Sequence, residues 1–137
     1  MKRVSAEPYS SSMIRVRYAE TDKMGVVYHA NYLVWFEIGR TDWLRENGWN
    51  YREMEAEGYA LPVIEAHCVY RQGARYDDEV EIRTRAKKLS QVRAQFDYEA
   101  IRHSDKTLLA TAYSVHVSID RHGRVVKLPE RVRELFS

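Results

Sequence analysis

The sequence predicts an α+β fold in which one long central helix is wrapped by a curved antiparallel sheet. Large side chains recur at three- and four-residue steps over residues 30–47, which is typical of a helix with one buried face. Beyond residue 60 the period changes to two, as in strands with one side in the core and one in water. The turns between these strands are short and polar, and short turns join antiparallel neighbours, because a parallel crossover needs about a dozen residues or more.

The first ordered element expected is a strand over residues 13–18, in which Ile14, Val16 and Tyr18 partly alternate with arginines. We expect residues 1–11 to form a loose N-terminal segment, with the serines of residues 10–12 as a polar spacer. A polar, turn-forming stretch over residues 20–25 then leads to the helix.

The main helix over residues 30–47 is followed by Gly48, at the position where glycine commonly ends a helix. Its spacing pattern is carried by Leu33, Phe36, Arg40, Trp43 and Leu44. Gly39 lies inside this helix, where glycine costs roughly 1 kcal/mol relative to alanine. Either a close approach of helix and sheet requires Gly39, or it is a chance substitution. A second, short helix is expected over residues 51–57, ended by Gly58.

Four strands are expected next. They cover residues 61–71, 80–87, 92–100 and 109–119. We expect their apolar sides to cover the only long helix. In the last strand one side carries Leu109, Thr111, Tyr113, Val115, Val117 and Ile119, and the other carries Ala110, Ala112, Ser114, His116 and Ser118. Such a sheet leaves edge strands open, which favours edge-to-edge dimers.

Composition narrows the class of protein. With 137 residues the chain is expected to form a single domain, residues 1–137. A single cysteine, Cys68, excludes an internal disulfide and any multi-cysteine metal site, and we expect it to be a buried small hydrophobe. No apolar stretch is long enough for a membrane span, and no secretory signal opens the sequence, so we expect a cytoplasmic protein without stable membrane insertion.

The charges argue against a nucleic-acid partner. The net charge is +2, from 22 basic and 20 acidic residues that are mostly interspersed, as on an ordinary solvated surface. The nearest candidates for a basic stripe are residues 83–88 and 121–124. The charge pattern does not exclude the binding of a small anionic ligand. We expect neither a metal nor a cofactor. Four of the five histidines lack the spacing of metal ligands, namely His67, His103, His116 and His122.

The segment of residues 18–32 concentrates the groups that chemistry needs. It contains a carboxylate, a histidine, an amide and three tyrosines: Asp22, His29, Asn31, Tyr18, Tyr28 and Tyr32. Free backbone N–H groups at a helix start attract anions and developing oxyanions, and a carboxylate beside them could act as nucleophile or general base. Equally, Asp22 could only shape the loop, with His29 as an ordinary helix-start residue. The spacing alone leaves both readings open.

Residues 17–37, RYAETDKMGVVYHANYLVWFE, resemble the signature of the 4-hydroxybenzoyl-CoA thioesterase family. More narrowly, they resemble its acyl-CoA thioesterase branch, associated in many bacteria with the Tol–Pal cluster. The resemblance continues through residues 74–78, 96–99, 117–120 and 128–130. It implies the hot-dog fold, homodimers or homotetramers, and hydrolysis of an acyl-CoA thioester to free acid and CoA. The resemblance also implies an active site at a dimer interface, with the acyl group in a tunnel between subunits.

The resemblance also implies roles for single residues. Asp22 falls on the catalytic aspartate, which either attacks the thioester carbonyl or activates water. The backbone N–H of His29 falls where the family polarises that carbonyl, a contribution typically worth about 10²–10³ in rate. The side chains of His29 and Tyr18 fall near the reacting group and are assigned to orientation or proton handling. Asn31 and Tyr32 are helix-start and packing residues.

For the phosphates of CoA the resemblance nominates one group of residues, Lys88, Ser90, Arg93, Arg124 and Lys127. Met24 departs from the family, which often has a small residue there, and a larger side chain would reshape the acyl pocket. Placement of the acid in a Thr-Asp-x-x-Gly loop favours hydrolysis over hydration. Two alternatives stay open: a non-catalytic module that binds acyl-CoA or acyl carrier, and a thioesterase acting on acyl-carrier protein.

Overall fold

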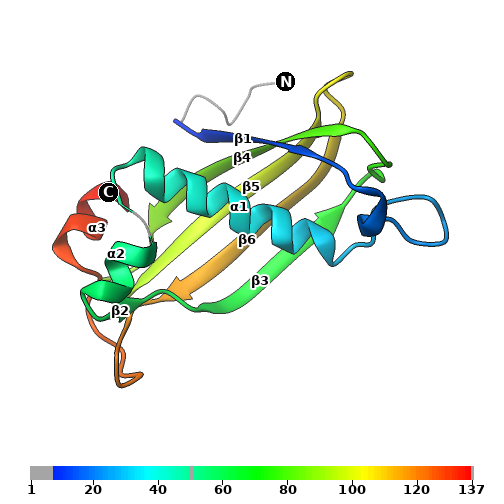
Figure 1. Cartoon of the computed structure of the whole chain (residues 1–137). Coiled ribbons are helices and arrows are strands. Elements are labelled where there is room, and N and C mark those ends of the chain that lie inside the picture. Colours follow the sequence, from blue (N-terminus) through cyan, green and yellow to red (C-terminus); the bar gives the residue numbers. More distant parts are fainter. Residues whose placement is uncertain (1–7, 50, 137) are drawn as a thin grey trace.

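The computed structural model of the chain describes residues 8–49 and 51–136 (Figure 1). Its helices are α1 (Asn31–Glu46), α2 (Tyr51–Ala56) and α3 (Glu130–Phe136), and a 3₁₀ turn covers Tyr18–Glu20. The strands are β1 (Ser10–Arg15), β2 (Tyr59–Ala60), β3 (Val63–Tyr70), β4 (Glu79–Lys88), β5 (Arg93–Arg102), β6 (Leu108–Val117) and β7 (Ile119–Asp120). None of the helices in the described residues is long and apolar enough to cross a membrane.

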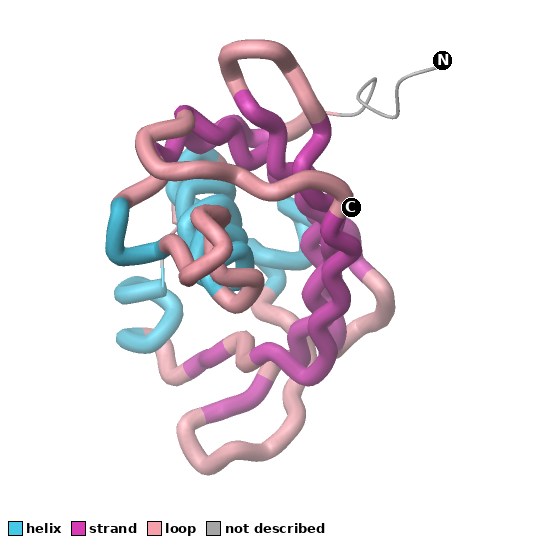
Figure 2. The backbone as a smooth tube through the Cα atoms, turned by 90° about the vertical axis from the view of Figure 1, so that its right-hand side faces the viewer, coloured by secondary structure: helices cyan, strands magenta, loops and turns pink. Residues whose placement is uncertain are grey.

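Five strands form one antiparallel sheet in the order β1-β4-β5-β6-β3, and β2 pairs with β7 in a small second sheet. Figure 2 shows the long helix α1 nearly end-on, with the strands curving around it. Aromatic side chains of α1 form the centre of the core, because Trp35 and Phe36 are buried and Phe36 stacks on Tyr98 of β5. The predicted α+β fold, a central helix wrapped by an antiparallel sheet, is confirmed.

Gly39 marks the closest approach of α1 to the sheet. A Cβ atom at this position would lie 2.9 Å from Cγ2 of Ile82 and would collide with the hydroxyl of Thr84, both on β4. Of the two explanations for this glycine, the close approach of helix and sheet is therefore confirmed. The helix ends as expected, since Gly48 has a φ of +85°.

The structure corrects the expected start of the first strand. β1 begins at Ser10, so the predicted polar spacer is part of the sheet, and Ser10 and Ser12 are buried. Small hydroxyl side chains fit here because β1 faces α1, where the Ser12 hydroxyl donates a 2.7 Å hydrogen bond to Asp42. Of the expected loose segment, residues 1–7 lie outside the described residues, and Ser10 and Ser11 already pair with β4.

The faces of β6 also differ in part from the expectation. The side with small and polar residues faces the helix: Ala110 and Ala112 pack in the core, and Ser114 and His116 are buried. Tyr113, from the more apolar side, instead stacks on His67 of the exposed strand β3, whereas Leu109 from that side is buried in the core. Large aromatic side chains on α1 leave room only for small residues opposite them, since protein interiors are close-packed.

Candidate active site

The loop between β1 and α1 is held by a buried carboxylate, Glu20. Its Oε1 accepts the backbone N–H of Arg17 at 2.8 Å, and its Oε2 accepts the indole N–H of Trp35 on α1 at 3.0 Å. Its backbone carbonyl accepts the N–H of Tyr28 and the side-chain amide of Asn31, both at 2.9 Å. These bonds fix the loop to the first turn of the helix. The predicted helix-start role of Asn31 is confirmed by its bond.

Asp22 lies at the turn of this loop. Its Oδ1 accepts the N–H of Met24 at 2.8 Å, and its backbone carbonyl accepts the N–H of Gly25 at 3.0 Å. Gly25 has a φ of +81°, which a glycine adopts without strain. Within residues 8–49 and 51–136, Asp22 forms no ion pair. The carboxylate is therefore oriented by the turn and available to a ligand.

The first turn of α1 offers free donors. Among the described residues, the N–H groups of His29 and Ala30 donate no hydrogen bond. The backbone carbonyl of His29 accepts the hydroxyl of Tyr70 at 3.0 Å. Burial, together with the hydrogen bond to the Cys68 thiol, raises the pKa of Tyr70 to about 12, so this hydroxyl remains a donor at neutral pH. Tyr70 thus ties the end of β3 to the start of α1.

Asp22 and His29 share one cavity of about 300 Å³. Tyr32, Tyr70 and residues 71–73 complete its wall. This wall is held by hydrogen bonds between the N–H of Val27 and the carbonyl of Ala74 at 2.9 Å, and between the N–H of Ala74 and the Tyr32 hydroxyl at 3.2 Å. Tyr32 is buried, as its predicted packing role requires. Asp22 and His29, one with a carboxylate and the other with a free backbone N–H, therefore line one hollow.

Two residues expected near this cavity lie apart from it. Tyr18 is 76% exposed, contacts Tyr76 edge to face and lines a separate shallow hollow on the far side of Asp22. Met24 is 81% exposed and lines none of the cavities described here. In the single chain the Met24 side chain is exposed, and the expectation that it reshapes an acyl pocket between subunits stays a prediction. Cys68 is half-buried and packs against the core, less enclosed than expected.

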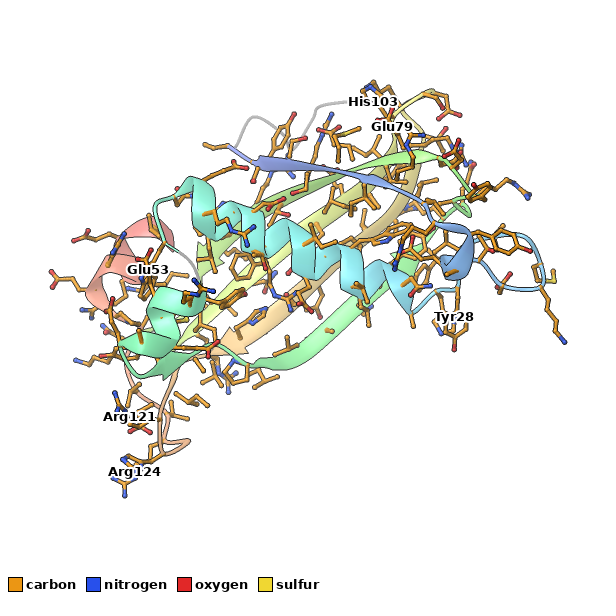
Figure 3. All side chains as sticks on the ribbon, viewed as in Figure 1. Tyr28, Glu53, Glu79, His103, Arg121 and Arg124 are labelled. Carbon is orange, nitrogen blue, oxygen red and sulfur yellow. The ribbon has the colours of Figure 1, made fainter. Side chains whose placement is uncertain are left out.

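The residues nominated for CoA binding lie toward the end of the molecule that is opposite the cavity. The turn with Ser90 runs beside the C-terminal segment, where the N–H of Leu128 donates to the carbonyl of Gln91 at 2.9 Å. In Figure 3 the Arg124 hairpin and Tyr28, next to His29, mark the two ends of the molecule. This end carries Lys88, Ser90, Arg93, Arg124 and Lys127. One chain alone does not bring them to Asp22.

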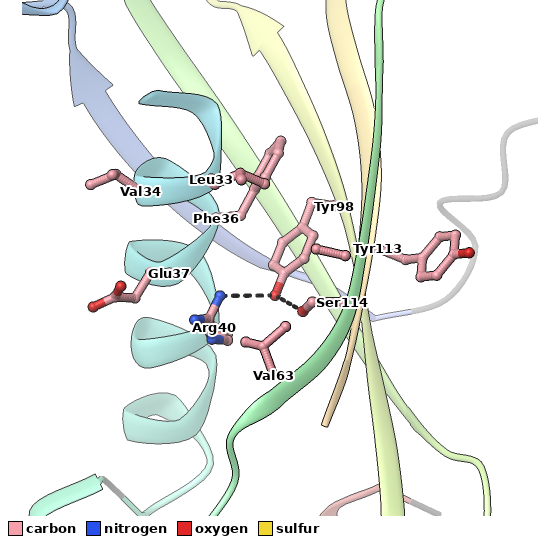
Figure 4. A pocket seen from close by; sticks show the side chains of 10 residues that line it. Leu33, Val34, Phe36, Glu37, Arg40, Val63, Tyr98, Tyr113 and Ser114 are labelled. Atoms are coloured by element: carbon pink, nitrogen blue, oxygen red, sulfur yellow. Dashed lines mark hydrogen bonds between the residues drawn. The ribbon is translucent and has the colours of Figure 1, made fainter. Parts of the chain in front are cut away.

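A second hollow, a groove between α1 and β3, lies further along the helix than the cavity. It has a volume of about 230 Å³ and is lined on one side by Leu33, Phe36 and Arg40, and on the other by Val63 and Ala66 (Figure 4). Inside it the Arg40 guanidinium donates to the Tyr98 hydroxyl at 3.4 Å. The sequence signal for this residue was present, because Arg40 is a charged side chain on the apolar face of the predicted helix. Glu20 and Tyr70 carried no comparable signal.

A long helix inside an antiparallel sheet, with a carboxylate loop and a cavity beside the helix start, is the arrangement of a hot-dog domain. The chain belongs to the thioesterase-like superfamily, whose family model matches residues 16–136. It is 35% identical over 107 residues to YbgC of Escherichia coli, named an acyl-CoA thioester hydrolase, and the match covers 78% of this chain and 79% of YbgC.

Solved structures give the same result. A Thermus thermophilus protein, TT1821, superposes with a TM-score of 0.86 at 38% identity, over 93% of this chain and 96% of that one. DHNA-CoA thioesterase from Staphylococcus aureus superposes with a TM-score of 0.83 at 35% identity, over 88% and 80%. The predicted class, a thioester hydrolase with the hot-dog fold, is confirmed. The link to the Tol–Pal cluster and the cytoplasmic location stay predictions.

Proposed function

We propose that this protein hydrolyses acyl-CoA thioesters to a free carboxylic acid and CoA. The observation that carries the proposal is the cavity shared by Asp22 and His29, which brings a carboxylate together with a residue whose backbone N–H is unused. The names of two relatives support the substrate class, since one is an acyl-CoA thioester hydrolase and the other a DHNA-CoA thioesterase.

In the proposed reaction the thioester carbonyl oxygen accepts the His29 N–H at the positive end of α1. This donor stabilises the negative charge that develops on the oxygen in the tetrahedral intermediate. Asp22 either attacks the carbonyl carbon, or removes a proton from water that attacks it. The intermediate then collapses with loss of the CoA thiolate. In the first route water hydrolyses the acyl–Asp22 anhydride and restores the carboxylate.

We assign the side chains of His29 and Tyr18 to the outer part of this site. The His29 ring lies 6.0 Å from the Tyr70 ring, centroid to centroid, and 4.5 Å from that of Tyr28. It therefore sits at the mouth of the cavity, where it can orient the thioester. Tyr18 reaches the substrate only from the far side of Asp22, so a variant of Tyr18 is expected to affect the rate less than one of His29.

A second copy of the chain completes the proposed site. β3 is an edge strand exposed along nearly its whole length, and apolar side chains beside it on α1 are exposed as well. These include Leu33 and Val34 on α1 and Val63 and Ile64 on β3, each between 45% and 50% exposed. Pairing of β3 with its two-fold copy covers this surface. The two-fold axis rotates the partner by 180°, so that the partner's nominated CoA residues lie at the end of the first copy that carries Asp22.

Mixing two inactive variants tests this shared site. Asp22→Asn lacks the acid, and the double variant Lys88→Ala, Arg93→Ala lacks part of the nominated CoA contact. In a mixed dimer, one site combines Asp22 of the double variant with Lys88 and Arg93 of the Asp22→Asn variant. Subunit exchange is therefore expected to restore up to one active site per dimer. Light scattering that finds a stable monomer, or mixing without recovery while exchange is verified, contradicts the shared site.

The substrate class is tested by measuring CoA release with a thiol reagent over short, long and aromatic acyl-CoAs. The same acyl groups on acyl-carrier protein are measured in parallel. Turnover of acyl-CoA is the expected result. Binding of acyl-CoA without turnover would instead favour a non-catalytic module, and turnover confined to the carrier-linked acyl groups would favour an acyl-carrier-protein thioesterase.

A further inference from the structure

We propose that the groove between α1 and β3 holds the acyl chain, and that Arg40 binds a carboxylate at the far end of that chain. The preferred substrates would then be thioesters of dicarboxylic acids, with CoA on one carboxyl group and the other free. This inference rests on the proposed function, because it assigns to the groove the acyl group of a thioester bound at Asp22 and His29, with the copy that pairs along β3 closing the groove over that acyl group.

Arg40 is the cation at the inner end of a groove with mainly apolar walls. Leu33, Val34 and Phe36 of α1 and Val63 and Ala66 of β3 provide these walls. Within the described residues, no carboxylate oxygen lies within 4 Å of the Arg40 guanidinium. Glu37, one turn earlier, also lines the groove, but it forms no ion pair with Arg40 and points away from it (Figure 4). The guanidinium in this groove therefore has no carboxylate in contact with it.

The hydrogen bonds around Arg40 leave part of its donor capacity unused. Arg40 donates to the hydroxyl of Tyr98 at 3.4 Å and also bonds Tyr51, while its buried Nε–H has no acceptor. A guanidinium has five N–H donors in a fixed plane, which matches the two oxygens of a carboxylate. A half-buried guanidinium with a free donor and no counter-ion favours an anionic ligand.

The groups behind Arg40 are already committed to one another. Tyr98 and Ser114 lie 2.6 Å apart, oxygen to oxygen, and the Ser114 hydroxyl lies 2.8 Å from Nε2 of His116. Nδ1 of His116 lies 2.9 Å from the carbonyl oxygen of Leu61, which can only accept, so Nδ1 carries the proton and Nε2 accepts from Ser114. Ser114 in turn accepts from Tyr98, and Tyr98 accepts from Arg40. This chain is neutral and fixes the guanidinium without neutralising it.

The length of the groove sets the length of the acyl chain. From His29 to Arg40 the helix advances about 16 Å, and the arginine side chain reaches back by roughly a turn. An extended chain advances about 3.4 Å over three bonds, so about 8 to 12 bonds separate the thioester carbonyl from a carboxylate at Arg40. A chain of four carbons is too short to reach it.

The test compares acyl-CoAs in pairs of equal length, one ending in a methyl group and one in a carboxylate, from 4 to 14 carbons. We expect kcat/KM to favour the carboxylate by about 10-fold or more at 9 to 13 carbons and not at 4, as for a charge-assisted hydrogen bond. Arg40→Gln is expected to abolish this preference, Arg40→Lys to retain part of it, and neither to change the hydrolysis of butanoyl-CoA by more than a few fold. Arg45→Gln, on the exposed side of α1, is the matched control and keeps the preference.

Two outcomes would overturn the proposal, and they differ. Hydrolysis of butanoyl-CoA with a preference for methyl-ended chains at every length would remove the carboxylate assignment and leave the proposed function intact. Hydrolysis of no acyl-CoA at all, butanoyl-CoA included, would remove both. Circular dichroism and thermal melting of each variant verify that Arg40→Gln is folded, and if it is not, Arg40→Lys and the wild-type length series decide the question.

Discussion

Acidification is expected to destabilise this protein through one buried histidine, His116. Its side chain is fully buried on β6, and burial lowers its pKa from 6.5 to about 4, while the hydrogen bond to the Leu61 carbonyl opposes this shift. Below pH 6.5 the unfolded chain therefore takes up a proton that the folded chain does not. At 1.36 kcal/mol per pH unit, the free energy of unfolding falls by about 3 kcal/mol between pH 6.5 and pH 4, and this contribution levels off below pH 4.

The contribution of His116 is isolated by comparison with His116→Gln, which offers one donor and one acceptor and does not titrate. Urea unfolding at a fixed protein concentration, from pH 7.5 to pH 4, gives the free energy of unfolding of each protein. We expect the difference between wild type and variant to shrink as the pH falls. His103→Gln, at an exposed position, is the control and keeps the wild-type slope. Equal slopes for wild type and His116→Gln would refute the reasoning.

Three further substitutions test the fold and the loop. Gly39→Ala is expected to lower the free energy of unfolding by about 1–3 kcal/mol, measured by thermal melting, because its Cβ would meet Ile82 at 2.9 Å. Helix propensity alone predicts a raised melting temperature, and that result would contradict the close approach. Tyr70→Phe removes the 3.0 Å bond to the His29 carbonyl, and kcat is expected to fall about 3- to 10-fold with little change in melting temperature; an unchanged kcat would show that this bond does not position the helix start. Glu20→Ala leaves the indole N–H of Trp35 without its buried acceptor, so we expect the free energy of unfolding to fall by about 1–3 kcal/mol and kcat to fall with it. Urea unfolding and steady-state kinetics measure the two quantities. Wild-type values of both would argue against the role of Glu20 in the loop.

The helices and strands were predictable where the sequence repeats with a single period. The main helix was expected over residues 30–47 and covers Asn31–Glu46, because its apolar spacing is regular and Gly48 takes a positive φ at its end. The faces of β6 were not predictable from alternation. The small side, with Ala110 and Ala112, faces the helix because the large aromatic residues of α1 occupy that space. Local patterns do not show which volumes meet in the core.

The site was predictable only as far as it lies in one segment. Asp22 and His29 are 7 positions apart and share a cavity, as the helix-start argument suggested. Tyr70 joins them from a strand 41 positions beyond His29, and Tyr98 meets Arg40 across 58 positions. No local pattern encodes such pairs, since they depend on how the sheet curves over the helix. The nominated CoA residues do not reach Asp22 within one chain, and one sequence does not specify how two copies would pair.

The central claim, that Asp22 acts on a thioester bound at the helix start, is tested most directly by Asp22→Asn. The measurement is kcat at saturating acyl-CoA together with Kd for the same acyl-CoA from calorimetry, with Asp77→Asn as a control outside the cavity. The expected result is a kcat reduced by about 10³-fold or more with Kd changed less than a few fold. A variant that keeps most of the wild-type kcat would contradict the claim and leave Asp22 as a residue that only shapes its loop.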